Sequence, residues 1–532
     1  MLSIGDHEAI VVGAGFAGLH MLHRLRQSGM DATAFEAGPS VGGTWYWNRY
    51  PGARCDFESH DYSYSFDDAL QKEWVWQERY PAQPEILRYL NHVADRFDLR
   101  PHLRLQSRIT SAHYDDDSGR WTVTTDTGEQ ATTRFLIFAT GALSLPQVPN
   151  FSGLESFRGS WYHTANWPSE PVDFTGRRVA VIGTGSSGVQ VVPRIAAQAE
   201  QLFVLQRTAA FVVPAHNHPL DPERDAQIKS DYSGFRQRAL ESFLGIHFDT
   251  EPTLAVHTGA ADRIKAYEDR WRIGGAALLA TFPDLLVDAA ANETLADFLR
   301  QKISDIVDDP ATAKALTPYG FPVGAKRLIV DSDYYQTFNK DNVELVDIAA
   351  APIEAITAHG IRTSDNHYEV DTIVFATGFD ALTGPLLNID IVGKAGIRLT
   401  DRWAAGPMTY LGLAVAGFPN MFTLAGPGSP SVLSNVVRCT EHNVEWVAEL
   451  LEHASDNGVS AIEASSDAES AWVNHVNELS EATIFPTANS WYLGANIPGK
   501  PRVFMPYAGG LPAYRQTCAE VAEDGYRGFH LT

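Results

Sequence analysis

The chain has 532 residues, of which 41 are Lys or Arg and 65 are Asp or Glu, so its formal net charge is −24. Its 44% hydrophobic and 11% aromatic residues can fill several packed cores, which excludes a mainly disordered protein. Because an acidic surface repels phosphate backbones and anionic lipid head groups, the charge argues against nucleic-acid and membrane partners. A small anionic ligand would need its own basic site.

The cysteine pattern bears on the compartment. Cys55, Cys439 and Cys518 lie far apart in the sequence without C-x-x-C spacing, which argues against a disulfide framework, a zinc site or a dithiol redox centre. We therefore expect a reducing, cytoplasmic location and no metal. The N-terminal segment lacks a basic region, and its apolar run at 9–12 ends at Gly13, so no export signal is expected.

The most membrane-like stretch, residues 410–425, is interrupted by Gly412 and Gly417. These interruptions favour two buried strands joined by a turn over a spanning helix.

In the first 200 residues, short β-branched runs alternate with helical patterns, which is typical of βαβ units with a parallel sheet. The pattern starts twice, at residues 9–12 and at 179–182. Residues 209–322 are polar and helical in pattern, with one apolar stripe (Leu295, Phe298, Leu299, Ile303 and Ile306) that stops before Pro310. Strands are expected again at 342–348 and 372–376, and a further helix around 444–451.

A dinucleotide-binding motif follows the first strand directly. Gly13, Gly15 and Gly18 form G-x-G-x-x-G, and Glu36 ends the next apolar run. Such glycines let a pyrophosphate approach the backbone and a helix N-terminus, while the acid accepts hydrogen bonds from ribose hydroxyls. This site therefore suits FAD or NAD.

A second motif, with glycines at 183, 185 and 188 and with Ser186 and Ser187 between them, follows the strand at 178–182. At the place that corresponds to Glu36 stand Arg207 and Thr208. Because a basic residue there favours a ribose 2′-phosphate, this site suits NADP, although Arg207 as a solvated strand-end charge is the alternative. The glycines are Gly183, Gly185 and Gly188.

Two nearly identical strings, 135–141 and 373–378, end in Ala-Thr-Gly and bracket the second motif. Their spacing predicts a second nucleotide domain inserted into the first. We expect an α/β protein with two Rossmann-like dinucleotide-binding domains, for FAD (1–150 and 382–532) and NADP (151–208 and 323–381), and a helical insertion at 209–322.

Two further strings carry a family resemblance. Residues 157–168 read F-R-G-S-W-Y-H-T-A-N-W-P, and Gly43, Thr44 and Trp45 are followed by Tyr-Pro-Gly and Asp56. Together they resemble the motifs of type I Baeyer–Villiger monooxygenases, in particular the branch with phenylacetone and steroid monooxygenases. The resemblance implies an enzyme that uses FAD, NADPH and O₂ to convert ketones to esters or lactones through a C4a-peroxyflavin and a tetrahedral adduct.

By the same resemblance, Arg327 is the active-site cation and Asp56 the carboxylate that pairs with it. A guanidinium keeps its proton near neutral pH and offers directional donors to a negatively charged adduct. Lys326 would recognise the 2′-phosphate together with Arg207. Without the family context, Lys326 and Arg327 read as a solvated basic pair on a loop.

The resemblance also implies a mostly apolar substrate pocket, with Trp491 on a mobile loop over the nicotinamide. His163 would lie on the linker between the nucleotide domains in a conformational role, with a packed, hydrogen-bonded histidine as the alternative. The small side chain at 142 predicts room for bulky ketones. The expected pocket residues are Ala142, Leu143, Ser431, Val432, Leu433 and Met505.

Other functions are compatible with the two nucleotide motifs. A flavin enzyme that oxygenates nitrogen or sulfur needs neither the Asp56–Arg327 pair nor the long motif, and a disulfide reductase needs a cysteine pair that the chain lacks. A non-catalytic NADP-binding sensor is the alternative from a different class. The partners expected are a small ketone and O₂, without an obligate protein partner.

Overall fold

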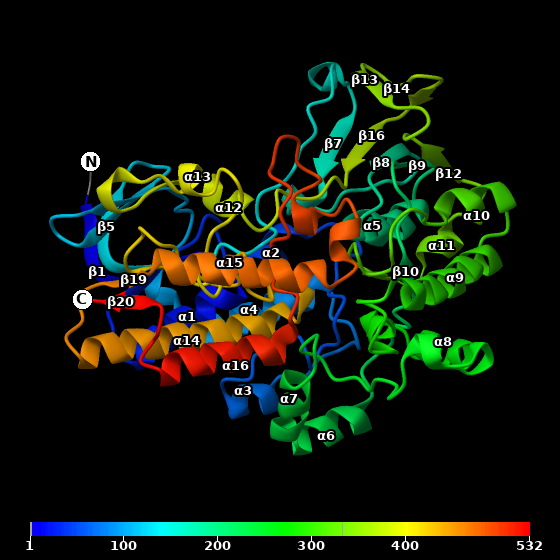
Figure 1. Cartoon of the computed structure of the whole chain (residues 1–532). Helices are drawn as coiled ribbons and strands as arrows, with labels where there is room; N and C mark the ends of the chain where they lie inside the picture. Colours follow the sequence, from blue (N-terminus) through cyan, green and yellow to red (C-terminus); the bar gives the residue numbers. More distant parts are fainter. Residues whose placement is uncertain (1–2, 332) are drawn as a thin grey trace.

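The computed structural model describes residues 3–331 and 333–532. Figure 1 shows two sheet-containing bodies, one with both termini and one with strands β7, β8, β9, β12 and β16. Helices α8, α9 and α10 lie beside the second body, α6 and α7 lie near α3, and long helices run along the first body.

The first sheet has eight strands in the order β17-β4-β5-β6-β1-β2-β3, with β18 also paired to β6. Strands β1, β2, β3 and β6 are parallel, whereas β5 is antiparallel to both of its neighbours. The strands are β1 (Ser3–Val12), β2 (Ala32–Phe35), β3 (Leu103–Arg104), β4 (Ile109–Asp115), β5 (Arg120–Thr125), β6 (Gln130–Phe138), β17 (Asp390–Val392) and β18 (Met421–Thr423). The predicted run at 9–12 forms the buried end of β1, which confirms the first strand.

The second sheet has five parallel strands in the order β12-β9-β8-β16-β7. They are β7 (Ser160–His163), β8 (Arg178–Ile182), β9 (Gln201–Gln206), β12 (Val343–Asp347) and β16 (Thr372–Phe375). Helix α5 (Ser186–Ala196) packs against β8 and β9. The expected strands at 342–348 and 372–376 are therefore confirmed, as is the α/β fold class with two Rossmann-like domains.

Helices dominate the segment between β9 and β12. They are α6 (Pro222–Ser230), α7 (Tyr232–Leu240), α8 (Ala260–Ile273), α9 (Ala289–Ile306) and α10 (Pro310–Leu316). The apolar stripe predicted at 295–306 buries the inner face of α9, and Asp309 caps α10 after the break. One short strand, β10 (Val212–Val213), lies inside this segment and pairs with β11 (Ile329–Val330).

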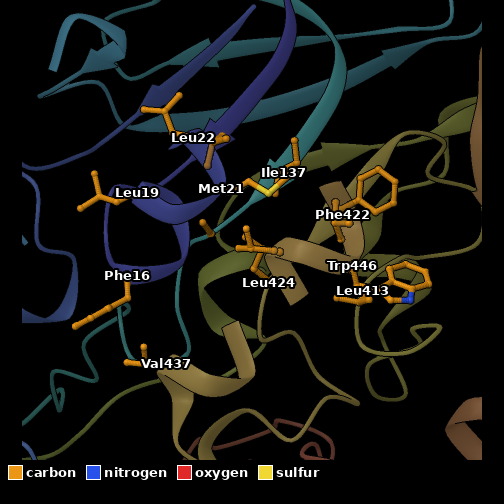
Figure 2. Close-up of a cluster of buried hydrophobic side chains, with 14 of the residues drawn as sticks. Phe16, Leu19, Met21, Leu22, Ile137, Leu413, Phe422, Leu424, Val437 and Trp446 are labelled. Carbon is orange, nitrogen blue, oxygen red and sulfur yellow. The ribbon is translucent and has the colours of Figure 1, made fainter. Parts of the chain in front are cut away.

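C-terminal helices close the first body. Helix α14 (Val436–Asp456) packs against α1 (Phe16–Gln27), and Figure 2 shows side chains of both helices meeting residues of β6 and β18 in one core. Burial of each large apolar side chain contributes about 1.5–3 kcal/mol, so this core ties the C-terminal segment to the N-terminal sheet. Helices α15 (Ser466–Glu481) and α16 (Gly510–Glu523) lie alongside, as Figure 1 shows.

The remaining elements are short, apart from the 14-residue helix α4. They are α2 (Thr44–Trp47), α3 (Asp68–Glu73), α4 (Gln83–Arg96), α11 (Tyr334–Thr337), α12 (Gly384–Leu387), α13 (Leu399–Arg402), β13 (Ile353–Thr357), β14 (Gly360–Thr363), β15 (His367–Glu369), β19 (Ile462–Ala464) and β20 (Phe529–Leu531). Within the described parts of the chain, no helix is both long and apolar enough to cross a lipid bilayer.

One predicted element is wrong. Residues 410–425 were expected to form two strands, but only the second forms, as β18. Leu411 and Gly412 both have positive φ, of 56° and 69°, and the backbone N–H of Tyr410 donates to the carbonyl of Ala414. The first half is therefore a tight turn, because two consecutive left-handed residues cannot continue a strand.

Candidate active site

A cavity of about 820 Å³ brings together part of the predicted site. Its wall includes Gly13 and Gly15 of the first glycine motif, Asp56, Arg327, and Ser186 and Ser187 at the start of α5. Arg207, Thr208, Lys326 and the three glycines of the second motif are not part of its wall. The cavity therefore reaches from the first sheet to the second.

At the first motif, two glycines are required by packing. A Cβ on Gly13, which has φ of 110°, would lie 2.5 Å from the Ala139 carbonyl oxygen, and a Cβ on Gly18 would lie 1.9 Å from the Gly13 oxygen. Gly15 begins α1 and lies against Gly43, the residue before α2. The N-terminus of α1 is thus open to the cavity, which is the arrangement that admits a pyrophosphate.

Glu36 and Trp45 complete this end. The Glu36 carboxylate accepts hydrogen bonds from the backbone N–H groups of Ala14 (2.8 Å) and Gly38 (2.7 Å). Burial raises the pKa of Glu36 more than these bonds lower it. Because each carboxylate oxygen has two lone pairs, Glu36 can still accept from ribose hydroxyls. Thr44 and Trp45 belong to α2, and the Trp45 indole N–H donates to the Tyr62 hydroxyl at 3.1 Å.

The second motif repeats this packing. A Cβ on Gly183 would lie 2.4 Å from the Ala376 oxygen, and one on Gly188 would lie 2.1 Å from the Gly183 oxygen. A Cβ on Gly185, in contrast, would meet no atom of the described residues within 4 Å beyond its own chain neighbours, and this glycine is exposed at the start of α5. Each Ala-Thr-Gly string therefore packs against the glycine turn of its own sheet.

Arg207 and Lys326 come from different segments. Burial lowers the pKa of Lys326 most, and the Arg207 charge lowers it further, which places the two cations within electrostatic range of each other. The Lys326 ammonium also lies 4.3 Å from the centre of the Phe321 ring. Within residues 3–331 and 333–532, neither cation forms an ion pair with a carboxylate. Thr208 packs at the same edge, where its carbonyl accepts a hydrogen bond from the Thr184 hydroxyl at 3.0 Å.

Arg327 lies two residues before β11 and pairs with Asp56, which follows α2. Its Nε donates to Asp56 Oδ2 at 2.8 Å, Nη2 lies 2.7 Å from the same oxygen, and Nη1 donates to the Val432 carbonyl at 2.8 Å. The guanidinium also lies 5.2 Å from the centre of the Phe57 ring. Both charged side chains are about a quarter exposed, toward the cavity (23% and 25%).

Tyr492 is a neighbour of Arg327 that the sequence did not reveal. Its buried side chain interacts with the guanidinium of Arg327. Burial alone would lower the pKa of Arg327, but Asp56 and Tyr492 together raise it above its ordinary value. Arg327 therefore stays protonated, with more N–H donors than Asp56 and the Val432 carbonyl use.

Three of the six predicted pocket residues line the cavity. Ala142, Leu143 and Val432 do so, and Trp491 lies beside them. The other three were expected to line the pocket but are not part of the cavity wall; they are Ser431, Leu433 and Met505. Ser431 is fully buried with a φ of 44°, and Met505 packs behind the wall against buried Ala381 and Leu382.

The comparisons with known proteins agree with this geometry. Residues 6–224 match the flavin-binding monooxygenase-like family. The chain is 41% identical to the 2-oxo-Δ³-4,5,5-trimethylcyclopentenylacetyl-CoA monooxygenase of Pseudomonas putida over 98% of each protein. It is equally identical to a Baeyer–Villiger monooxygenase of Pseudooceanicola batsensis (98% and 95% covered) and to a phenazine N-monooxygenase of Lysobacter antibioticus (98% and 97% covered).

Solved structures are similar over 99% of both chains. An oxidized steroid monooxygenase bound to NADP is 51% identical with a TM-score of 0.95, and a closed cyclohexanone monooxygenase is 43% identical with a TM-score of 0.97. The chain belongs to the Baeyer–Villiger monooxygenase family. This confirms the resemblance carried by the motifs at 43–56 and 157–168.

The residues of this Baeyer–Villiger monooxygenase fit both cofactors. Space that a Cβ would fill is left open at Gly185, before α5, and Gly15, before α1, lines the cavity; both helices present N–H groups there. Buried Glu36 suits the ribose of FAD, and the adjacent cations Arg207 and Lys326 suit the 2′-phosphate of NADPH. A related monooxygenase structure contains FAD and NADP together.

His163 ends β7 of the monooxygenase and belongs to the cavity wall, but its side chain is only 3% exposed. Its Nδ1 accepts a hydrogen bond from the Ala165 N–H at 3.1 Å, so the proton is on Nε2. Nε2 lies 3.3 Å from the Gln147 carbonyl and 3.2 Å from the Thr377 hydroxyl. Gln147 and Thr377 stand on the two chain segments that connect the sheets.

Proposed function

We propose that this chain is an FAD- and NADPH-dependent monooxygenase that converts ketones to esters or lactones with O₂. The observation that carries this proposal is the Asp56–Arg327 pair, held on the wall of a cavity that begins at the first glycine motif. A cation that cannot release its proton and is already oriented by a carboxylate is suited to stabilise negative charge that develops on a ketone oxygen.

The assigned roles follow from the contacts. Bound FAD, once reduced by NADPH, supplies the activation of O₂. Arg327 directs its remaining N–H groups at the ketone oxygen, and Asp56 orients the guanidinium and lowers the cost of its partial burial. Trp45, Phe57 and Tyr62 line the cavity and keep water from it. Arg207 and Lys326 bind NADPH through its 2′-phosphate, and Trp491 contacts its nicotinamide end.

The substrate is proposed to be a bulky ketone. The wall formed by Ala142, Leu143 and Val432 is apolar, and the alanine methyl occupies little of the cavity. An aryl or polycyclic ketone should therefore be oxidised, along with smaller cyclic ones. If only small cyclic ketones give ester, the idea that Ala142 provides room is wrong.

We also propose the organisation of the whole chain. The two sheets support an FAD domain of residues 1–150 and 382–532 and an NADP domain of 151–208 and 323–381, with the helical insertion at 209–322. We propose a small ketone and O₂ as the partners, without an obligate protein partner, nucleic acid or membrane. The three buried, free cysteines support the cytoplasm as the location.

The test compares the wild-type protein with Arg327→Ala. Wild-type protein with FAD, NADPH, O₂ and an aryl ketone should form an ester, detected by mass spectrometry. Arg327→Ala should still oxidise NADPH, now releasing H₂O₂, but lose about 10²–10³-fold in ester formation, as for removal of one oxyanion-stabilising donor. Arg362, whose side chain is exposed and pairs with Glu354, offers a matched control as Arg362→Ala. Retained ester formation in Arg327→Ala would disprove its role.

Oxygenation of nitrogen or sulfur is the second candidate, and one relative is named for phenazine N-oxidation. A ketone, a sulfide and an aromatic N-heterocycle should therefore be compared in one series. The Asp56–Arg327 pair favours the ketone. Higher kcat/KM for the heterocycle, unaffected by Arg327→Ala, would favour N-oxygenation instead. A protein that binds NADPH but consumes none with any substrate would be a sensor.

A further inference from the structure

The loop between α15 and α16 holds two residues of the site in one short turn. Trp491 and Tyr492 begin the 3₁₀ turn Trp491–Leu493, which ends at Gly494 with a φ of 69°. The Tyr492 carbonyl accepts a hydrogen bond from the Met505 N–H at 3.0 Å, which closes the loop on itself. Trp491 lines the cavity, and Tyr492 interacts with Arg327.

Two side chains attach this loop to the segment after β16. The Lys500 ammonium lies 2.5 Å from Asp380 Oδ1 and donates to the Ala381 carbonyl at 2.9 Å. The Asn496 amide donates to the Phe379 carbonyl at 2.8 Å. Lys500 is only 10% exposed, and its aliphatic stem lies over Gly494, where a Cβ would be 3.0 Å from Cδ of the lysine.

The segment at 378–382 is itself paired with the segment at 142–147, and together they connect the two sheets. The backbone N–H groups of Gln147, Asp380 and Leu382 donate to the carbonyls of Gly378, Leu145 and Ala142, each at 2.9 Å. We call this pair of segments the paired linker. Apolar contacts among Ala142, Leu382, Trp491 and Met505 join the loop to the paired linker on the pocket side.

We propose that Lys500 and Asp380 are positioning residues, whose ion pair fixes the loop of Trp491 and Tyr492 to the paired linker between the nucleotide-binding sheets. The inference rests on the proposed function and extends it. Through Tyr492 the loop interacts with Arg327, and through Trp491 it forms part of the cavity wall. The ion pair therefore makes the orientation of the active-site arginine depend on the conformation of the linker.

Burial distinguishes this pair from an ordinary surface ion pair. Exposed ion pairs contribute little to stability because solvent screens their charges. Removal of one partner from a buried ion pair, in contrast, leaves an uncompensated buried charge. The Lys394–Glu463 pair of the same chain, at 3.4 Å with Lys394 57% exposed, is the ordinary kind. Lys394→Met is therefore a control that removes a lysine ion pair elsewhere.

The test measures loop structure as well as activity. Amide hydrogen exchange of the protein with bound FAD and NADP⁺ should be faster over residues 489–505 in Lys500→Met and in Asp380→Asn than in the wild type. Exchange in α14 should not change. The double variant should exchange no faster than either single one, because both remove the same interaction. Lys500→Arg, which keeps the charge, should exchange more slowly than Lys500→Met.

Activity gives the second readout. Ester formed per NADPH consumed should fall about tenfold in Lys500→Met and Asp380→Asn, less than the roughly hundredfold that a 1 Å misplacement can cost. Lys394→Met should behave as the wild type in both assays. Unchanged exchange in both single variants, or an effect of Lys500→Met without one of Asp380→Asn, would overturn the proposal. If wild-type protein forms no ester, the proposed function fails, while the exchange experiment still decides whether the pair holds the loop.

Discussion

Arg207 and Lys326 are two cations brought close together, and no carboxylate of the described residues pairs with either. Such an arrangement is unfavourable by itself, as the lowered pKa of Lys326 indicates, since both burial and the Arg207 charge oppose its protonation. A dianionic phosphate would reverse that balance by pairing with both side chains. The repulsion between the two like charges is therefore offset only when a phosphate binds.

Removal of either cation should therefore impair the use of NADPH but not the use of NADH. Each hydrogen bond to a charged group contributes about 1.5–3 kcal/mol, so Arg207→Ala or Lys326→Met should raise the KM for NADPH by about 10- to 100-fold. The KM for NADH, which lacks the 2′-phosphate, should stay near the wild-type value. Steady-state kinetics with both cofactors measures this. Exposed Lys340 serves as a control in Lys340→Met.

The pH dependence of the same preference gives a second check. Because the pKa of Lys326 is lowered, its charge is lost at a lower pH than for a free lysine, and the preference for NADPH should weaken as pH rises. Arg207→Ala removes the like charge, so the pH at which the remaining preference weakens should move up. Equal increases in KM for NADPH and NADH would contradict the phosphate assignment.

At the residue level, sequence motifs located the charged members of the site but not their neutral partners. Asp56 and Arg327 are 271 positions apart, and only the family resemblance predicted that they pair. The structure contains this ion pair. Tyr492 could not be found in this way. In the sequence, a tyrosine beside a tryptophan resembles a core aromatic, and only the structure relates it to Arg327. Ser431 was placed on the pocket wall, yet its left-handed backbone turns it into the interior.

At the level of elements, the two glycine turns show why the Ala-Thr-Gly strings repeat. In each sheet the strand that precedes the string, β6 or β16, lies beside the strand that precedes the glycine motif. The alanine carbonyl then fills the space where a Cβ of the first glycine would stand. The glycine turn therefore requires this string for its packing. The same string also lies where the chain passes from one domain to the other.

Two glycines of the second motif should respond differently to alanine. Gly188→Ala would place a methyl 2.1 Å from the Gly183 oxygen, and overpacking of this kind costs about 1–3 kcal/mol. Its melting temperature should fall. In Gly185→Ala the methyl meets no atom of the described residues beyond its chain neighbours, and the change of helix cap costs about 1 kcal/mol or less, but the methyl would stand where the pyrophosphate approaches.

Thermal melting and NADPH titration together separate these effects. Gly185→Ala should keep the wild-type melting temperature and bind NADPH more weakly, whereas Gly188→Ala should lose both stability and NADPH binding. FAD absorbance should be retained in Gly185→Ala, because the FAD motif is untouched. Unchanged NADPH affinity in Gly185→Ala would show that the phosphate does not approach this turn.

The elements predicted from sequence were those with a regular apolar period, such as β1, β8 and α9. The exception at 410–414 had suitable apolar residues, but the left-handed pair Leu411 and Gly412 bends the chain. The attachment of residues 489–505 to 378–382 could not be predicted. Its partners, Lys500 and Asp380, are 120 positions apart in irregular segments, and no periodic pattern relates them.

For the whole molecule, His163 connects the strand β7 to both segments of the paired linker, at Gln147 in one segment and at Thr377, directly before the other. The Thr377 hydroxyl donates to the Gln147 carbonyl at 2.6 Å, and the Nε2 of His163 lies within hydrogen-bonding distance of both groups. This arrangement needs a neutral imidazole, because Nδ1 must accept from the Ala165 N–H. Burial lowers the pKa of His163 below 6.5, more than the Gln147 hydrogen bond raises it.

His163→Leu should leave FAD binding and the KM for NADPH near wild type, because neither cofactor motif contains the residue, but ester formed per NADPH should fall. Exposed His359 provides the matched control, His359→Leu. The sign of the pH effect follows from the lowered pKa. The unfolded chain binds a proton at His163 near pH 6.5 and the folded chain does not, so this histidine favours folding less as pH falls below 6.5.

The free energy of unfolding, measured by urea denaturation from pH 5 to 8, should therefore fall less steeply on the acid side in His163→Leu than in the wild type. Buried His23 and His442, with pKa values of about 4, add a fall of the same sign in both proteins, so the difference between the two curves isolates His163. Parallel curves would mean that His163 is charged in the folded protein. In that case Nδ1 could not accept from Ala165, and only the Nε2–H, next to Gln147 and Thr377, would still connect β7 to the paired linker.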